Sequence, residues 1–232
     1  MSEGRRPAAG QPEQAELVAA DLEGTLSRAE TWRALARRLR AAGLERRYRL
    51  FVLRRLPAVV GVRLGLIARQ QFRDRWLSDF AGLLRGTSVA GFERLAEAIV
   101  AEDLWPARNL AAVGELEAHI AADRRVVLCS GTYQPVLEAF ARRLGAADAM
   151  GTPLEASDGM LTGRLAQPPN TGPRKAARLR AALDGRRLRA AYGDSLADAE
   201  MLESAAEPVA VLPEPDLRRL AAARGWRTLE AG

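Results

Sequence analysis

Acidic residues stand close together at two distant places in this 232-residue chain. Asp21 and Glu23 follow a short apolar run two residues apart, and alternate residues of an extended chain point to the same side. Two carboxylates placed in this way can divide a reaction between a nucleophile and an acid/base. A helix N-cap or a loop charge is the alternative, and for this pair alone it is the better interpretation.

A second acidic pair, Asp194 and Asp198, lies four residues apart and follows Gly193. Mg²⁺ prefers oxygen ligands and usually takes one or two protein carboxylates while keeping several waters. The pair could therefore contribute to a magnesium site. Simple capping is again the alternative, because Gly-Asp-Ser before a helix is ordinary capping chemistry.

Hydroxyl residues follow an apolar, strand-like run at 125–131. Ser130 and Thr132 flank Gly131 and precede a helix predicted to begin near Pro135. Hydroxyls and backbone N–H groups at the start of a helix suit a phosphate, although an N-cap explains the same residues.

Lys175 is the single lysine among the 35 lysine and arginine residues of the chain. Chance could leave one lysine in an arginine-rich sequence. The alternative is a site that needs a compact ammonium on a flexible stem, which a planar guanidinium cannot replace.

The apolar pattern divides the chain into one strand, a long helical stretch and an alternating region. Residues 16–26 begin as a buried strand, and residues 29–112 have helical periodicity, with a stop at Gly43 and a break or kink at Pro57. From residue 113 onward helices and strands alternate, which favours a parallel α/β sheet.

Two local patterns complete the predicted topology. Asp158-Gly159 lies between two short runs and is typical of a hairpin turn. In open parallel sheets ligands bind at the carboxyl ends of the strands. We therefore expect the three polar strand ends, at 21–25, 130–132 and 193–198, to lie close together.

The overall composition limits the classes of molecule that we expect this chain to bind. The formal charge of +6 suits anionic partners, whereas the aromatic content of 5% is not interleaved with basic residues, so we expect no nucleic acid. The single cysteine, Cys129, precludes an intrachain disulfide and suits the cytoplasm. Residues 1–14 are polar, lack the apolar segment of a signal peptide and are predicted to form a disordered tail. No run of 18 apolar residues is present.

Taken in order, the motifs Asp21-x-Glu23-Gly24-Thr25-Leu26, Ser130, Lys175 and Gly193-Asp194-Ser195-x-x-Asp198 resemble those of the haloacid dehalogenase-like (HAD) hydrolase superfamily. The helical insertion resembles the C1 cap of its phosphoserine-phosphatase-like branch, subfamily IB. The resemblance implies an α/β fold, with a Rossmann-like parallel-sheet HAD core (15–28 and 113–232) and an inserted all-helical C1 cap domain (29–112).

The resemblance also implies a Mg²⁺-dependent phosphomonoester phosphatase that forms an aspartyl-phosphate. Asp21 would be the nucleophile, Glu23 the acid/base, Ser130 a phosphoryl ligand and Lys175 the neutralising cation. The expected metal-binding residues are Asp21, Glu23 (through its carbonyl), Asp194 and Asp198. The expected substrate-binding residues are Thr25, Gly131, Thr132 and Glu30.

Glu23 departs from the family pattern, in which a second aspartate usually stands. The extra methylene extends the reach of the acid and bears on the efficiency of the acid/base step. Two alternatives to a phosphatase stay open, and Glu23 motivates only the second. One is a phosphotransferase on the same scaffold, and the other is a non-catalytic phosphate-binding protein.

Two features bear on the substrate. Glu30 lies nine residues after Asp21, where phosphoserine phosphatases keep a glutamate that meets the substrate ammonium, and a solvated charge is the alternative. Residues 48–70 combine apolar residues with arginines, as in a helix lying on an anionic membrane, but the inside of a helical cap is the favoured interpretation. The expected substrate is a small-molecule or lipid-headgroup phosphomonoester, for a cytoplasmic protein with a possible peripheral membrane contact.

Overall fold

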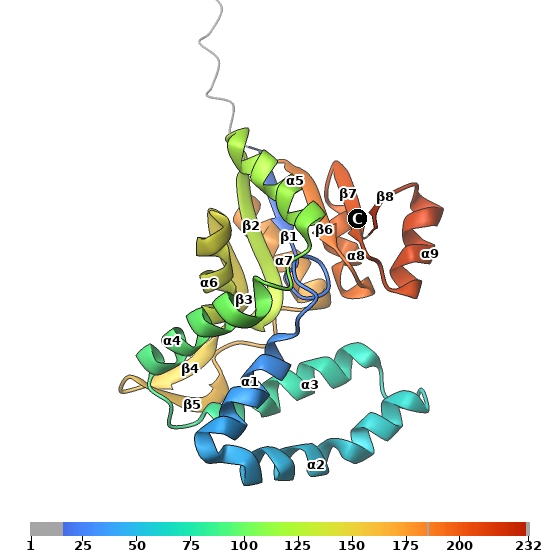
Figure 1. Cartoon of the computed structure of the whole chain (residues 1–232). Coiled ribbons are helices and arrows are strands. Elements are labelled where there is room, and N and C mark those ends of the chain that lie inside the picture. The colour runs from blue at the N-terminus through green and yellow to red at the C-terminus, as the bar shows by residue number, and fades with distance from the viewer. Residues whose placement is uncertain (1–15, 185, 231–232) are drawn as a thin grey trace, which may run out of the picture.

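The computed structural model describes residues 16–184 and 186–230 of the chain. The predicted tail, residues 1–14, lies outside this range. Figure 1 shows a sheet flanked by helices in one half of the molecule and a set of helices in the other half. We refer to these halves as the core and the cap.

The core is built on a six-stranded sheet in the order β3-β2-β1-β6-β7-β8, and every adjacent pair is parallel. This confirms the predicted Rossmann-like parallel sheet. Strand order reverses beside β1, which is where open α/β sheets form their ligand-binding crevice. The strands are β1 (Leu17–Ala20), β2 (Arg125–Tyr133), β3 (Asp148–Thr152), β6 (Leu188–Gly193), β7 (Glu207–Val211) and β8 (Arg227–Leu229).

Helices cover both faces of the sheet. Alternate residues of β1 show this, because they pack into two different apolar clusters. Val18 and Ala20 belong to the cluster that contains buried residues of α5 and α6. Leu17 and Ala19 belong to the cluster of α7, α8 and α9. The core helices are α5 (Leu110–Ala121), α6 (Gln134–Leu144), α7 (Gly172–Leu183), η4 (Leu196–Asp198), α8 (Ala199–Glu203) and α9 (Pro215–Arg224).

The cap follows β1 and is helical, as predicted. Gly43 has a φ of 85° and separates two helices at the predicted stop. Pro57, by contrast, does not break its helix, because α2 continues from Glu45 to Arg63. The cap comprises α1 (Thr31–Leu39), η1 (Arg40–Leu44), α2 (Glu45–Arg63), α3 (Arg69–Ala81), η2 (Gly82–Leu84), α4 (Val89–Ile99) and η3 (Val100–Leu104).

The predicted hairpin at Asp158-Gly159 is confirmed, and it contacts the cap. Strands β4 (Leu154–Ser157) and β5 (Met160–Leu165) pair antiparallel. The Gly86 N–H donates to the Leu161 carbonyl at 2.9 Å, and the Leu161 N–H donates to the Thr87 carbonyl at 2.8 Å. A segment assigned to the core by sequence therefore supports the cap, and the exact domain boundaries stay a prediction.

Polar contacts also fasten the cap over the carboxyl edge of the sheet. Asp74 of α3 accepts a hydrogen bond from the Thr171 hydroxyl at 2.6 Å and pairs with Arg174 of α7. The Tyr133 hydroxyl at the end of β2 donates to the Leu77 carbonyl at 2.7 Å. The cap is thus held close to the three polar strand ends.

Candidate active site

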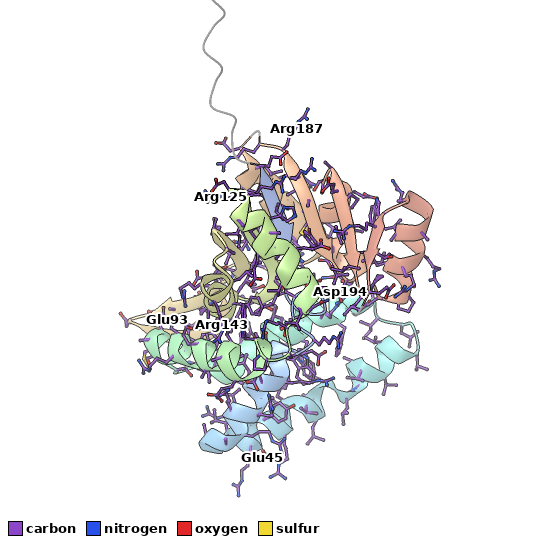
Figure 2. All side chains as sticks on the ribbon, turned by 45° about the horizontal axis from the view of Figure 1, so that its top comes forward. Glu45, Glu93, Arg125, Arg143, Arg187 and Asp194 are labelled. Carbon is purple, nitrogen blue, oxygen red and sulfur yellow. The ribbon has the colours of Figure 1, made fainter. Side chains whose placement is uncertain are left out.

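The three polar strand ends meet at one cavity between the core and the cap, as the sequence predicted. Its volume is about 540 Å³, and its floor includes Asp21, Ser130, Lys175 and Asp194. Figure 2 shows Asp194 where the core meets the cap, whereas Arg125 and Arg187 lie at the other end of the strands. The cavity therefore occupies the carboxyl edge, where parallel sheets bind ligands.

Lys175 lies at the centre of the cavity floor. Its Nζ is 2.5 Å from an Oδ1 of Asp21 and 2.5 Å from an Oδ1 of Asp198, and the side chain is only 3% exposed. Burial alone would lower the pKa of Lys175, but the charges of Asp198 and Asp21 outweigh it and raise the pKa. The lone lysine is therefore a charged, buried link between the first and last motifs.

Three carboxylates crowd together beside this ammonium. Oxygen atoms of Asp21, Asp194 and Asp198 all lie within 4.8 Å of one another. Burial raises the pKa of Asp21 to about 6, with Lys175 opposing it, and burial together with the charge of Asp21 raises the pKa of Asp194 to about 8. Such mutual repulsion is relieved when a divalent cation binds, so the donor set fits Mg²⁺.

The backbone leaves no room for side chains around these carboxylates. A Cβ on Gly24, whose φ is 86°, would lie 2.1 Å from Oδ2 of Asp194.

Thr25, expected to bind substrate, is instead fully buried and does not line the cavity. Its hydroxyl donates to Oδ1 of Asp194 at 3.4 Å, so Thr25 supports a carboxylate.

Asp198 is oriented by its own loop. Its Oδ2 accepts hydrogen bonds from the Ser195 N–H at 3.2 Å and from the Ser195 hydroxyl at 3.1 Å. Its Oδ1 contacts Lys175, so both oxygens already have protein partners. The capping interpretation of Asp198 is thus confirmed, while its part in a metal site stays a prediction.

Glu23 faces the cavity but is held apart from the three clustered carboxylates. Its Oε1 accepts a hydrogen bond from the Thr31 N–H at 2.8 Å and another from the Thr132 hydroxyl at 3.2 Å. Burial raises the pKa of Glu23, and the Thr31 hydrogen bonds oppose this shift. Because Thr31 begins α1, the longer glutamate side chain connects the core motif to the first cap helix.

The end of β2 contributes a further group of lining residues. Ser130, Gly131 and Thr132 all line the cavity, and the Ser130 Oγ accepts a hydrogen bond from the Thr132 N–H at 3.4 Å. Asn170, which we did not predict, donates to the Ser130 carbonyl at 3.4 Å and to the Met150 carbonyl at 2.5 Å. No spacing signal marks Asn170, because its partners come from distant strands.

The cap side of the cavity is mostly apolar. Its apolar and aromatic lining residues are Trp32, Leu35, Val59, Phe72, Trp76, Leu77 and Phe80. Trp76 packs within the cap, with its ring 4.8 Å from that of Phe51 and 5.5 Å from that of Trp32. The sequence did not show that this aromatic cluster also faces the site.

Charged cap residues also reach the cavity. Arg28, Glu30 and Arg73 line it. Glu30, the predicted partner of a substrate ammonium, forms an ion pair with Arg33 on the same helix. A substrate ammonium would therefore have to compete with a guanidinium for Glu30.

The fold and the site together define a class of Rossmann-like α/β proteins in which a strand-end carboxylate cluster lies beneath a cap. The sequence profile of the haloacid dehalogenase-like hydrolases matches residues 18–203, and the chain belongs to this family.

Individual relatives agree with this assignment. Phosphoserine phosphatase SerB1 of Mycobacterium tuberculosis is 36% identical over 152 residues, covering 62% of this chain and 48% of that protein. The chain thus spans about half the length of this curated relative. A Bordetella pertussis protein of unknown function matches with a TM-score of 0.75 and 26% identity, over 94% of this chain and 100% of that one. A substrate-bound phosphoserine phosphatase matches with a TM-score of 0.62 and 18% identity, over 93% of each chain.

Among residues 16–184 and 186–230, no helix combines the length and apolarity needed to cross a bilayer.

Proposed function

We propose that this chain is a Mg²⁺-dependent phosphomonoester phosphatase that works through an aspartyl-phosphate on Asp21. The observation that carries the proposal is the buried Lys175 ammonium, 2.5 Å from both Asp21 and Asp198. Phosphoryl transfer depends on positioning and charge neutralisation, and this arrangement supplies both. The hydrolase family and a relative named as a phosphatase support it.

In the first step an Asp21 carboxylate oxygen attacks phosphorus, and the bond from phosphorus to the ester oxygen breaks. The Glu23 carboxyl group donates its proton to the leaving oxygen. The Ser130 hydroxyl and the backbone N–H groups beside it lie in the same cavity and would hydrogen-bond the phosphoryl oxygens. Lys175 keeps the nucleophile oriented and balances the charge that the phosphoryl group brings.

In the second step water attacks the phosphorus of the aspartyl-phosphate. The Glu23 carboxylate accepts a proton from this water, and the bond between phosphorus and the Asp21 oxygen breaks, which releases orthophosphate. The hydrogen bonds from Thr31 and Thr132 hold the Glu23 carboxylate at one position for both proton transfers.

Asp21, Asp194 and Asp198 would hold the magnesium, together with the Glu23 carbonyl that the family resemblance implies. A bound Mg²⁺ would supply Lewis-acid stabilisation of phosphoryl charge. Asp198 would also orient Lys175, because its Oδ1 lies 2.5 Å from the ammonium nitrogen.

For the substrate we propose an organic group that is apolar, as in a lipid-linked phosphate, in preference to phosphoserine. The cap wall offers aromatic surface that an apolar organic group would contact. An additional methylene in an apolar pocket is worth about 1–3 kcal/mol of discrimination. We therefore expect kcat/KM for naphthyl phosphate to exceed that for phosphoserine by at least about tenfold.

The test measures orthophosphate release with Mg²⁺ from a chromogenic aryl phosphate, from naphthyl phosphate and from phosphoserine. Turnover that Asp21→Asn abolishes supports the proposal, and so does loss on chelation that added Mg²⁺ restores. Equal release by wild type and Asp21→Asn would sink the nucleophile assignment. Faster turnover of phosphoserine would overturn only the choice of substrate.

A further inference from the structure

An apolar stripe runs along the outer side of α2 and its connection to α3. Six of the nine exposed large hydrophobic side chains among residues 16–184 and 186–230 lie between Leu50 and Leu66. We call these residues, Leu50, Leu53, Leu56, Val60, Leu64 and Leu66, the outer stripe. The members on α2 recur every three or four residues and so share one side of the helix.

The outer stripe is separate from the face that packs inside the cap. Phe51 is buried and makes edge-to-face contacts with Trp76 and Phe80, and Val59 lines the cavity. Figure 1 shows α2 as the cap helix farthest from the sheet, with no described element on its outer side. The helix is therefore apolar on two sides, and only one of them is covered by protein.

The charge of this region is equally one-sided. Residues 46–73 contain eight arginines and no aspartate or glutamate. The segment thus carries +8 while the whole chain carries +6, which leaves −2 for all other residues together. Arg46, Arg47 and Arg54 are exposed and belong to none of the ion pairs found among residues 16–184 and 186–230.

We infer that the outer stripe docks on an anionic lipid bilayer, independently of the proposed phosphatase function. Exposed leucines flanked by arginines suit a helix whose apolar side enters the headgroup boundary while guanidinium groups meet lipid phosphates. A second copy of the chain fits less well, because it would bring two +8 segments together. The sequence favoured packing inside the cap for residues 48–70; the structure shows that only part of this segment is inside.

Docking in this orientation would also bring the cavity near the lipid. Val59 on α2 and Phe72 and Arg73 on α3 line the cavity, while Leu64 and Leu66 lie in the connection between these two helices. The lipid-facing connection is thus continuous in the chain with helix residues that line the cavity.

The test is sedimentation of the full chain with vesicles of phosphatidylglycerol and phosphatidylcholine, and with vesicles of phosphatidylcholine alone. Wild type should pellet with the anionic vesicles, and binding should weaken as salt increases. The double variant Leu53→Glu/Leu64→Glu should lose at least about tenfold in partitioning, since it replaces two exposed apolar side chains of the outer stripe with charged ones that lipid phosphates repel. Replacing Arg47 and Arg54 with Gln should cost about fivefold for each arginine.

The matched control is Leu110→Glu. Leu110 on α5 is 69% exposed, similar to Leu53 at 62% and Leu64 at 68%, but it belongs to the core. Its partitioning should equal that of wild type, and all variants should keep the thermal unfolding midpoint. Wild type that stays in the supernatant at low salt overturns the inference. So does equal pelleting of the stripe variants, or a wild-type dimer that those variants dissociate.

Discussion

Replacing Lys175 with arginine tests whether the site needs an ammonium or only a positive charge. The Nζ lies 2.5 Å from oxygens of both Asp21 and Asp198, and the side chain is 3% exposed. The larger guanidinium must displace one of the two carboxylates or the surrounding backbone. Overpacking of a buried site costs about 1–3 kcal/mol, less than the 5–15 kcal/mol of a typical domain, so Lys175→Arg should still fold.

The effect on turnover should be much larger than the effect on folding. A displacement of about 1 Å at a reacting group can lower the rate about a hundredfold. Asp21, the proposed nucleophile, is in direct contact with Lys175 and would be displaced with it. We therefore expect kcat/KM of Lys175→Arg to fall about a hundredfold. Lys175→Met should also lose about 3–5 kcal/mol of unfolding free energy, because it leaves buried carboxylates without their partner.

The assay compares aryl phosphate turnover and thermal unfolding for these variants and for Arg180→Lys. Arg180 lies on the same helix, α7, and its side chain is 53% exposed, so its replacement should change neither quantity. Wild-type turnover in Lys175→Arg would refute the reasoning, because it would show that the site needs only a positive charge and that the single lysine is there by chance.

Two further substitutions test how the acidic residues are positioned. Glu23→Asp removes one methylene and should break the 2.8 Å hydrogen bond to the Thr31 N–H, so kcat should fall by about a hundredfold while aryl phosphate KM changes little; an unchanged kcat would contradict this role. Gly24→Ala places a Cβ 2.1 Å from Asp194 and should raise the Mg²⁺ concentration for half-maximal activity at least about tenfold, assuming a cost of about 1.4 kcal/mol at the site. Gly43→Ala is the control, because Gly43 has nearly the same φ (85° against 86° at Gly24) but its added Cβ would meet no neighbouring atom within 4 Å. Equal metal dependence in the two variants would count against the steric argument.

The sequence was sufficient to predict the parallel sheet and to predict that its polar strand ends lie close together. Both follow from periodicity and topology, since apolar runs such as the one before Asp21 become buried strands whose carboxyl ends share an edge. The hairpin at Asp158-Gly159 was also predicted, because turn residues act locally. The contact of that hairpin with the cap was not, since nothing in the sequence pairs Leu161 with Gly86 or Thr87.

The parts of the site that escaped prediction depend on contacts between distant segments. Asn170 orients the end of β2 from a loop 40 residues later in the chain, and its type alone marks no function. Thr25 belongs to a recognisable motif, yet its hydroxyl donates to Asp194 and does not line the cavity. For residues 48–70 the sequence offered both a membrane surface and the inside of the cap, because a pattern of apolar residues and arginines does not say which side of a helix other elements cover.

The most direct test of the central claim is to locate the phosphoryl group on the protein during turnover. The enzyme is mixed with an aryl phosphate and Mg²⁺, quenched in acid within one turnover and digested for peptide mass spectrometry. The account predicts a phosphorylated peptide with the modification on Asp21, absent from Asp21→Asn. Turnover accompanied by a phosphoryl group on another residue, or by the same modification in Asp21→Asn, would contradict it.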